Sequence, residues 1–380
     1  MDKDVSILAI LGYEGFYGAE RANYKVLDML SKQGASIYCI TSENANSEYI
    51  QMLNGISANF YVGRFGPTYF GLHKNTSHYF GNLSGMLRIS RLLIKAIKDH
   101  NITHIYIPNY IQFLYVYFGL FFIKKIVVFR VGDPPEQNKL HCFLWRMVIN
   151  PHVDSFVTNS KSTQSKLLNH GVEKRNTRVI KNCITRDIVN SKSKKTGAIT
   201  IICVGQITKH KGIDLAVLTA INICKEYHDV EFLFFGGIDE KNSFTRECIE
   251  LVNNSPFTDR ILFKGFARNI ESIYSKADLL ICPSVQEESS ANSVVESKFF
   301  RIPAVVFPRG GLPELINHKV DGYLCKNANI DSLECGIRYF LDDKVNLTRC
   351  GKNALISSDV FTEKVISKEW INLFQSTVKK

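Results

Sequence analysis

Short apolar runs alternate with longer amphipathic stretches along the whole chain. The apolar runs are rich in β-branched and aromatic residues, which is typical of buried strands, and the longer stretches have apolar residues at helical spacing. This alternation predicts βα units and therefore parallel sheets with helices on their faces. The predicted strands are Val5–Leu11, Ile37–Thr41, Ile102–Ile107, Ile126–Val131, Phe156–Thr158, Val179–Lys181, Ile199–Val204, Glu231–Phe235, Ile261–Lys264, Leu279–Cys282 and Ala304–Phe307.

The polar stretch Asn190–Gly197 separates the predicted strands into two series and has the composition of a linker. A chain of 380 residues also suits two domains better than one core. We therefore predict an α/β protein in which two doubly wound, Rossmann-like domains, residues 1–190 and 191–360, face each other across a cleft. Residues 361–380 predict an amphipathic helix, with Trp370 and Phe374 on one side, that returns to the first domain.

Composition narrows the class of protein. The chain is 45% hydrophobic and 22% charged, which is ordinary for a folded protein, and it has no apolar stretch of the roughly 18 residues needed to span a bilayer. Met1 is followed by charged residues rather than by an apolar signal core, so we expect a cytoplasmic protein. The ten cysteines form no Cys-x-x-Cys pair, and we expect reduced thiols rather than zinc ligands.

Most of the net charge of +11 lies in the first half of the chain. Residues 1–190 hold 22 Lys and Arg against 13 Asp and Glu, whereas the remainder holds 25 against 23. A basic half favours an anionic partner such as a membrane surface or a lipid-phosphate acceptor, although a solvated basic surface without a partner has the same composition. Because no motif combines aromatic and basic residues for recognition, we expect no nucleic acid as a partner.

The segment Tyr110–Ile123 is unusually apolar and aromatic. A helix that lies in the membrane interface is one interpretation. Its place between two predicted strands favours the other, a buried crossover helix.

Two glutamates follow the predicted strand Leu279–Cys282. Glu288 falls in the loop, and Glu296 lies about one turn inside a helix predicted over Asn292–Phe300. Both carboxylates can accept hydrogen bonds from sugar hydroxyls. The start of the helix also presents backbone N–H groups, from about Ser289 onward, to a phosphate. A glutamate pair at this spacing also occurs by chance in many proteins.

Three glycine-bearing loops also follow predicted strands. The loop VGQITKHKG contains Gly205, Lys211 and Gly212, so that a mobile cation stands beside backbone that can approach a ligand closely. The loop FPRGGLPEL contains Gly310-Gly311, and the loop after the first strand contains Gly15 and Gly18. In open α/β sheets, ligands bind beyond the carboxyl ends of the strands. Taken singly, each loop is also compatible with an ordinary turn.

Together and in this order, these elements resemble family 4 of the retaining glycosyltransferases, which adopt the GT-B fold. The resemblance covers nearly the whole chain and is strongest over Ile199–Leu324. It implies transfer of a hexose-type sugar from a UDP-, GDP- or dTDP-linked donor to a glycan or polyprenyl-diphosphate-linked acceptor, in O-antigen, capsule or lipopolysaccharide synthesis. It implies no cofactor and no divalent metal, and the basic first half adds possible peripheral contact with an anionic membrane at the inner face of the plasma membrane.

The resemblance also implies roles for individual residues. Glu288 and Lys211 would be catalytic, with Glu288 stabilising positive charge at the anomeric carbon and Lys211 neutralising the leaving diphosphate. Glu296 would accept hydrogen bonds from the ribose, and the base would lie near Phe266. The implied donor site comprises Gly205, Gln206, Lys211, Gly212, Phe266, Glu288, Ser289, Ser290, Ala291, Asn292 and Glu296, with Gly15 and Gly18 as the glycine loop of the first domain.

Two features depart from the family pattern. Gln206 stands where the family usually has Arg, so that Lys209, Arg130 or another cation would have to compensate. The first half also lacks the histidine often found after its middle strands, and we predict no catalytic histidine there. These departures leave open a non-catalytic nucleotide-sugar-binding protein, and a nucleotide-sugar hydrolase or epimerase of the same fold is the other alternative.

Overall fold

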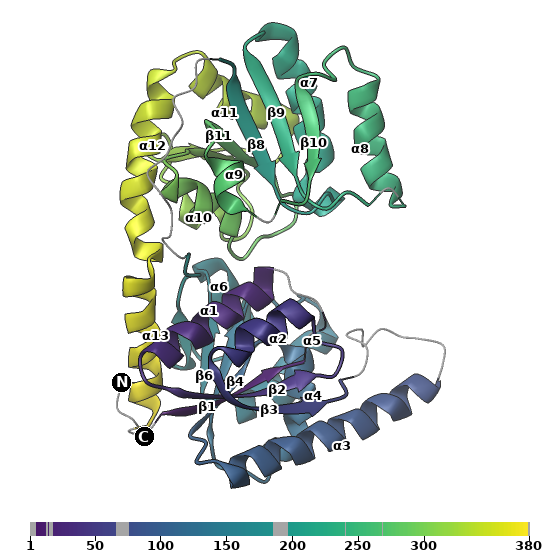
Figure 1. Ribbon diagram of the computed structural model, residues 1–380, viewed down its shortest axis with the longest axis vertical. Helices are drawn as coiled ribbons and strands as arrows, with labels where there is room; N and C mark the ends of the chain where they lie inside the picture. The colour runs from purple at the N-terminus through teal and green to yellow at the C-terminus, as the bar shows by residue number, and fades with distance from the viewer. Residues whose placement is uncertain are drawn as a thin grey trace. The chain divides into compact units, whose positions relative to one another are not determined.

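The structure is a computed structural model of the chain, and it describes residues 5–12, 14, 18–65, 76–184, 197–239, 241–267 and 269–378. The chain divides into two compact units. Unit 1 comprises Met1–Cys183 together with Glu363–Lys380, and unit 2 comprises Ile184–Thr362. Each unit contains its own parallel sheet with helices on both faces (Figure 1). The predicted linker falls almost entirely outside the described residues.

Unit 1 is built on a seven-stranded parallel sheet of order β3-β2-β1-β4-β5-β6-β7. The strands are β1 (Ser6–Leu11), β2 (Ser36–Ser42), β3 (Ser57–Gly63), β4 (His104–Ile107), β5 (Ile126–Val131), β6 (Ser155–Thr158) and β7 (Thr177–Val179). The helices are α1 (Gly18–Lys32), α2 (Ser47–Asn54), α3 (Thr76–Asp99), α4 (Tyr110–Leu120), α5 (Lys139–Leu144), α6 (Lys161–Asn169) and α13 (Glu363–Val378), and the π-helical turn Trp145–Ile149 continues α5.

Alternate residues of the central strands fill two separate layers of unit 1. In β1, Leu8 and Ile10 pack with α3 and α4 on one face, whereas Ile7 and Ala9 pack with α1 and α13 on the other. Strands buried on both faces read as continuous apolar runs, which is why the sequence pattern predicts them well. α13 lies beside α1, although the two helices are at opposite ends of the chain (Figure 1).

The predicted amphipathic C-terminal helix is present as α13. Trp370 and Phe374 are buried on its inner side, as the pattern predicts. Lys25 of α1 donates a hydrogen bond to Glu363 at the start of α13 (2.7 Å), and the ring of Trp370 packs against Tyr106 of β4.

The aromatic segment Tyr110–Ile123 forms a core helix, α4. Phe113, Tyr115 and Val116 are fully buried against the sheet, so the prediction of a crossover helix is confirmed. None of the helices that the structure describes has both the length and the apolar character needed to cross a membrane.

Unit 2 is built on a six-stranded parallel sheet of order β10-β9-β8-β11-β12-β13. The strands are β8 (Ile199–Val204), β9 (Val230–Phe235), β10 (Ile261–Gly265), β11 (Leu279–Cys282), β12 (Ala304–Val306) and β13 (Gly322–Leu324). The helices are α7 (Ile213–Glu226), α8 (Ser243–Asn253), α9 (Ile270–Tyr274), α10 (Asn292–Phe299), α11 (Ile330–Leu341) and α12 (Val345–Ser357). From β8, the next strands along the chain, β9 and β10, lie toward one edge of the sheet. From β11, the next strands, β12 and β13, lie toward the other edge, so the strand order reverses between β8 and β11.

Every predicted strand is present, and β7 lies two residues earlier than predicted. β3 and β13 are present in addition to the predicted strands. Both are edge strands, in which polar residues such as Ser57 and Asn59 interrupt the apolar run or the strand is only three residues long. All ten cysteines are free thiols, and seven of them are buried.

A buried ion pair fixes α10 within unit 2. Lys298 of α10 donates hydrogen bonds to Asp321 (2.8 Å) and to Ser357 of α12 (2.9 Å), and both charged side chains are only 2% exposed. Asp321 also accepts a hydrogen bond from the backbone N–H of Asn317 (2.8 Å). The charges are therefore satisfied on both sides, which is the condition under which a buried pair is tolerated.

We expect D321N to lower the free energy of unfolding of unit 2 by about 3–5 kcal/mol, because it leaves the Lys298 ammonium buried without a counter-charge. Urea unfolding followed by far-UV circular dichroism measures this effect; Trp145 and Trp370 both lie in unit 1, so tryptophan fluorescence does not report on unit 2.

The matched control is K344M, which breaks the exposed Lys344–Asp229 pair and should cost less than about 1 kcal/mol. The double variant K298M/D321N should be more stable than D321N alone. Equal effects of D321N and K344M would contradict the prediction.

Candidate active site

Lys211 and Glu288 lie at the point of unit 2 where the strand order reverses. Lys211 follows β8 and Glu288 follows β11, and these two strands are hydrogen-bonded neighbours that run in parallel. The carboxyl ends of parallel strands meet at one edge of the sheet, and the crevice at such a reversal is the usual ligand site of this architecture. The sheet therefore brings together two residues that are 77 positions apart.

The two side chains form an ion pair. Lys211 donates a hydrogen bond from Nζ to Oε1 of Glu288, and Ser284 Oγ donates to the same oxygen (2.8 Å). Both side chains are partly exposed, 29% for Lys211 and 16% for Glu288. A cation and a carboxylate with residual solvent access are thus held side by side, which suits a ligand that carries both negative charge and hydroxyl groups.

Two glycines permit the close packing of the loops around this pair. Gly212 has φ +67° and lies against Pro283, and Gly310 has φ +57° and lies against the backbone of Glu288. A Cβ at either position would overlap a carbonyl oxygen, that of Pro283 or that of Glu288. Gly311 then donates its N–H to the carbonyl of Glu288 (2.6 Å), so the predicted glycine turn after β12 supports the glutamate directly.

The two helices that follow the loops of Lys211 and Glu288 lack side-chain caps. Gly212 precedes α7 and Ala291 precedes α10, and neither supplies a capping side chain, whereas an asparagine caps α8, α9 and α11. Ser289, just before α10, has a buried hydroxyl with no hydrogen-bond partner in the part of the chain that is described. Uncapped helix starts and an unsatisfied hydroxyl are groups that an anionic, oxygen-rich ligand would satisfy.

Glu296 is held by a residue that sequence reasoning missed. Tyr274, in α9, donates a hydrogen bond from its hydroxyl to Oε2 of Glu296 (2.7 Å). Burial first, and then the charge and hydrogen bond of Glu296, raise the pKa of Tyr274 well above its ordinary value, so this phenol stays a donor. Its ring stacks on Phe300 at 5.2 Å, which fixes the hydroxyl in place. Glu288 is thus held by Lys211 and Ser284, and Glu296 by Tyr274.

Two buried thiols, Cys203 and Cys282, lie near the pair. Burial, and then the negative charge of Glu288, raise the pKa of Cys282 to about 12. Burial also raises the pKa of Cys203, whereas the nearby Lys211 lowers it. Both thiols therefore remain neutral and act as small apolar residues near the charged groups.

The other predicted donor residues of unit 2 occupy the same sheet edge. Gly205 directly follows β8 and donates its N–H to the carbonyl of Phe235 (2.9 Å), and Gln206 is exposed beside it. Ser290 and Asn292 flank Ala291 at the start of α10.

Phe266 is exposed and follows β10, two strands away from β8. The sheet therefore places it at the same edge, to the side of the Lys211–Glu288 pair.

The predicted residues of the first domain belong to unit 1. Gly18 is the first residue of α1 in unit 1, and Gly15 lies outside the described residues. Arg130, named as a possible substitute cation for Gln206, is buried in unit 1 and donates hydrogen bonds to Asn23 and Asn182 (both 2.8 Å). Its guanidinium is therefore already committed to the core of that unit.

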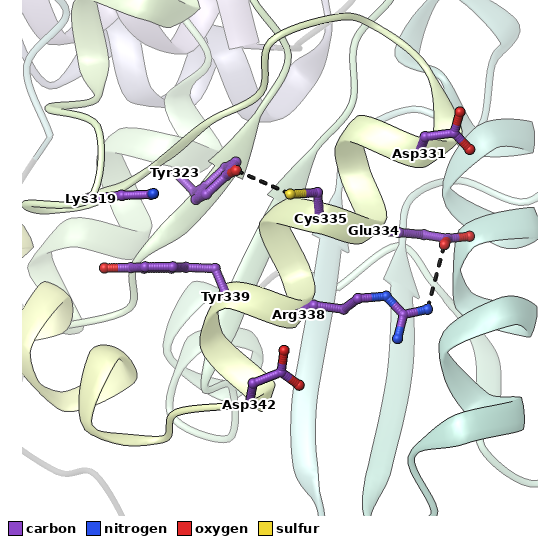
Figure 2. Close-up of a pocket in the computed structure, with 8 residues that line it drawn as sticks. All are labelled: Lys319, Tyr323, Asp331, Glu334, Cys335, Arg338, Tyr339 and Asp342. Carbon is purple, nitrogen blue, oxygen red and sulfur yellow. Dashed lines mark hydrogen bonds and ion pairs between the residues drawn. The ribbon is translucent and has the colours of Figure 1, made fainter.

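Among the described residues, no cluster of three or more His, Cys, Asp or Glu could hold a metal ion. A separate surface pocket of about 460 Å³ lies along α11 (Figure 2). Figure 2 shows two pairs among its eight side chains, Tyr323 with Cys335 (3.3 Å) and Arg338 with Glu334 (3.6 Å). None of the predicted site residues lines this pocket.

Solved structures with the same architecture cover essentially the whole chain. A glycosyltransferase from Rickettsia africae superposes with a TM-score of 0.82 at 16% identity, covering 99% of both chains. HepE from Anabaena, solved in complex with UDP, superposes with a TM-score of 0.80 at 16% identity, covering 98% of this chain and 100% of its own. The fold is therefore GT-B, with two Rossmann-like domains.

Sequence relatives point to the same class. The O-antigen biosynthesis glycosyltransferase WclY of Escherichia coli is 24% identical over 76% of this chain and 75% of its own length. An uncharacterized glycosyltransferase of Haemophilus influenzae is 26% identical over 45% of this chain. The chain spans about half the length of the Haemophilus relative and of a similar one from Methanocaldococcus jannaschii (47% and 44%).

Two family patterns divide the chain between them. The pattern of Glycosyltransferase Family 4 matches residues 16–187, and that of Glycosyl transferases group 1 matches residues 185–356. The chain belongs to the family 4 glycosyltransferases of GT-B fold, as its motifs predict.

We expect G310A to lower the free energy of unfolding of unit 2 by about 1–3 kcal/mol, because it places a side chain in the left-handed region and against the backbone of Glu288. Urea unfolding followed by circular dichroism measures the change. The matched control is G237A in the loop after β9, where a Cβ would meet nothing within 4 Å. A G310A variant as stable as G237A would show that the turn does not constrain Glu288.

Proposed function

We propose that this protein is a retaining, metal-independent glycosyltransferase that moves a hexose-type sugar from a nucleoside-diphosphate sugar to a glycan or lipid-linked acceptor. The Lys211–Glu288 pair at the reversal of strand order is the observation that carries this proposal. It offers one cation for a diphosphate and one carboxylate for sugar hydroxyls, and a nucleoside-diphosphate sugar contains both groups joined by one bond.

The surroundings of the pair fit the same ligand. The uncapped start of α10 and the unsatisfied Ser289 hydroxyl are suited to phosphate oxygens. Glu296, oriented by Tyr274, is an acceptor suited to ribose hydroxyls. The structural relative HepE was solved with UDP and with UDP-glucose, which favours a nucleotide-sugar as the donor here.

The reaction breaks the bond between the anomeric carbon and the diphosphate oxygen and forms a glycosidic bond on the same face of the sugar. The acceptor hydroxyl loses its proton to the departing phosphate. Lys211 and the backbone N–H groups before α10 stabilise the negative charge of the leaving diphosphate, and Glu288 stabilises the positive charge at the anomeric carbon. Catalysis is then mainly electrostatic, supplied by groups already in position.

A second cation near the diphosphate is needed because Gln206 is neutral. Lys209 lies two residues before Lys211 in a 3₁₀ turn, where positions two apart point about 120° away from each other. Arg309 lies directly before Gly310, which packs on the backbone of Glu288, and it is exposed with no ion pair in the described part of unit 2. Arg309 is therefore the substitute cation that we propose.

The acceptor is proposed from the net charge of the first half of the chain and from a sequence relative of known setting. The first half of the chain is basic, which suits an anionic acceptor such as a polyprenyl-diphosphate glycan or a lipopolysaccharide core. WclY acts in O-antigen biosynthesis, so cell-surface polysaccharide synthesis is the proposed setting.

We expect UDP, GDP or dTDP to raise the melting temperature of the protein, and the matching sugar conjugate to be consumed in the presence of acceptor. A new glycoside with the donor's anomeric configuration is the expected product. Free sugar alone would indicate a hydrolase, an isomerised nucleotide-sugar an epimerase, and binding without nucleotide release a non-catalytic protein.

In the same assay, K211A and E288Q should each lower kcat about 100- to 1000-fold, by analogy with the loss of one preorganised charge-stabilising group. Near-normal turnover in E288Q would contradict the assignment of this site.

We expect R309A to lower kcat/KM about 10- to 100-fold, because it removes a charge from the diphosphate site. K209A, in the same turn as Lys211, should change kcat/KM less than about threefold, because its ammonium points away. The double variant Q206R/R309A should recover most of the activity that R309A loses. A larger loss in K209A than in R309A would assign the second cation to Lys209 instead.

A further inference from the structure

An exposed apolar stripe runs along a helical segment of unit 1. Leu140 is 75% exposed, Phe143 is 62% exposed and Met147 is 58% exposed. They are spaced three and four residues apart, so they lie on one face of α5 and the π-helical turn that continues it. Large apolar side chains this exposed are individually ordinary, but three on one helical face form a patch that calls for a partner.

The fold of unit 1 does not need this stripe. The opposite face of the same segment carries Trp145 and Ile149, which are 2% and 0% exposed and belong to the core. Leu144 and Val148 also pack against that core. The segment is therefore already anchored, and its outward apolar residues add nothing to the packing.

Positive charge flanks the stripe. Lys139 and Arg146 are exposed on the same side of the segment, and neither has an ion pair within the described ranges. From Gln137 to Val153 the chain contains no Asp or Glu. The combination of Leu, Phe and Met with Lys and Arg on one face is typical of helices that lie in the interface of an anionic bilayer.

The end of α4 extends the apolar surface. The rings of Tyr110 and His141 lie 5.7 Å apart at the start of the two helical segments, and those of Phe121 and His152 lie 4.7 Å apart at their ends. α4 and the α5 segment therefore run side by side. Phe121 and Phe122 are exposed at the end of α4, just before Lys124 and Lys125.

We propose that the face formed by Lys139, Leu140, Phe143, Arg146 and Met147, here called the docking face, binds the surface of an anionic lipid bilayer. Its apolar side chains would enter the boundary between headgroups and acyl chains, and its two cations would lie among the phosphates. The proposal goes beyond the donor chemistry and is independent of it. It places the protein where a lipid-linked acceptor would be found.

The full-length protein should co-sediment with vesicles of phosphatidylglycerol and phosphatidylcholine, and much less with vesicles of phosphatidylcholine alone. L140S/F143S/M147S should lower the partition coefficient at least about tenfold, because it removes the buried apolar area. K139Q/R146Q should weaken binding severalfold and reduce its dependence on salt.

Unit 2 offers matched controls. Val345 and Ile356 are as exposed as the stripe, at 68% and 70%, and Lys326 and Lys352 are exposed cations. V345S/I356S and K326Q/K352Q should leave vesicle binding unchanged. If the control variants lost as much vesicle binding as the docking-face variants, the proposal would be overturned. Binding would then depend on the overall number of apolar and basic residues rather than on this face.

F143W supplies a local readout that does not depend on activity. The chain's own Trp145 and Trp370 are buried, so the new tryptophan should be the one whose emission shifts to the blue when anionic vesicles are added. An unshifted spectrum would overturn the proposal.

Sedimentation velocity tests the other occupant, a second copy of the chain. A dimer that L140S/F143S/M147S abolishes, with vesicle binding unaffected, would make the face a subunit interface. Nucleotides should raise the melting temperature equally in every docking-face variant. A failure of the membrane proposal can therefore be distinguished from a failure of the proposed nucleotide-sugar binding.

Discussion

The ion pair between Lys211 and Glu288 depends on one topological constraint, the reversal of strand order between β8 and β11. Because the two strands are neighbours whose following helices lead to opposite edges, the loops after them meet at the point where ligands usually bind in this architecture. Among the described strands of unit 2, no other neighbouring pair has this property. The order in which the strands are connected therefore determines where Lys211 and Glu288 meet.

The backbone around this point is held from several sides. His210, next to Lys211, accepts hydrogen bonds from the N–H groups of Val285 and Gln286 at 3.0 and 3.2 Å, which ties the first loop to the second. Gly311 ties the turn after β12 to Glu288. α10, which carries Glu296, is anchored by the buried contact of Lys298 with Asp321. The charged groups thus gain rigidity from backbone contacts, and a preorganised site needs little rearrangement when charge develops.

The strands were predictable because central parallel strands are buried on both faces and read as apolar runs. β3 and β13 were not, since an edge strand has less to bury. Among the candidate site residues, Lys211, Glu288 and the glycines could be predicted because each lies in a loop that follows a predicted strand. Tyr274 could not, because it sits in an ordinary mixed polar and apolar stretch and only the packing of α9 on α10 brings its hydroxyl to Glu296. Residues that support others through tertiary packing leave no local pattern.

The two units use exposed residues in different ways. In unit 2, the partly exposed Lys211 and Glu288 and the unsatisfied Ser289 hydroxyl lie at one sheet edge, where a small polar ligand would satisfy them. In unit 1, Leu140, Phe143 and Met147 are exposed beside two cations, along a helical segment whose inner face is already buried. Exposed apolar side chains are ordinary when they are scattered, whereas a contiguous patch of them marks an interaction site. An anionic bilayer presents an extended amphiphilic surface that would cover such a patch, whereas a single small polar molecule would not.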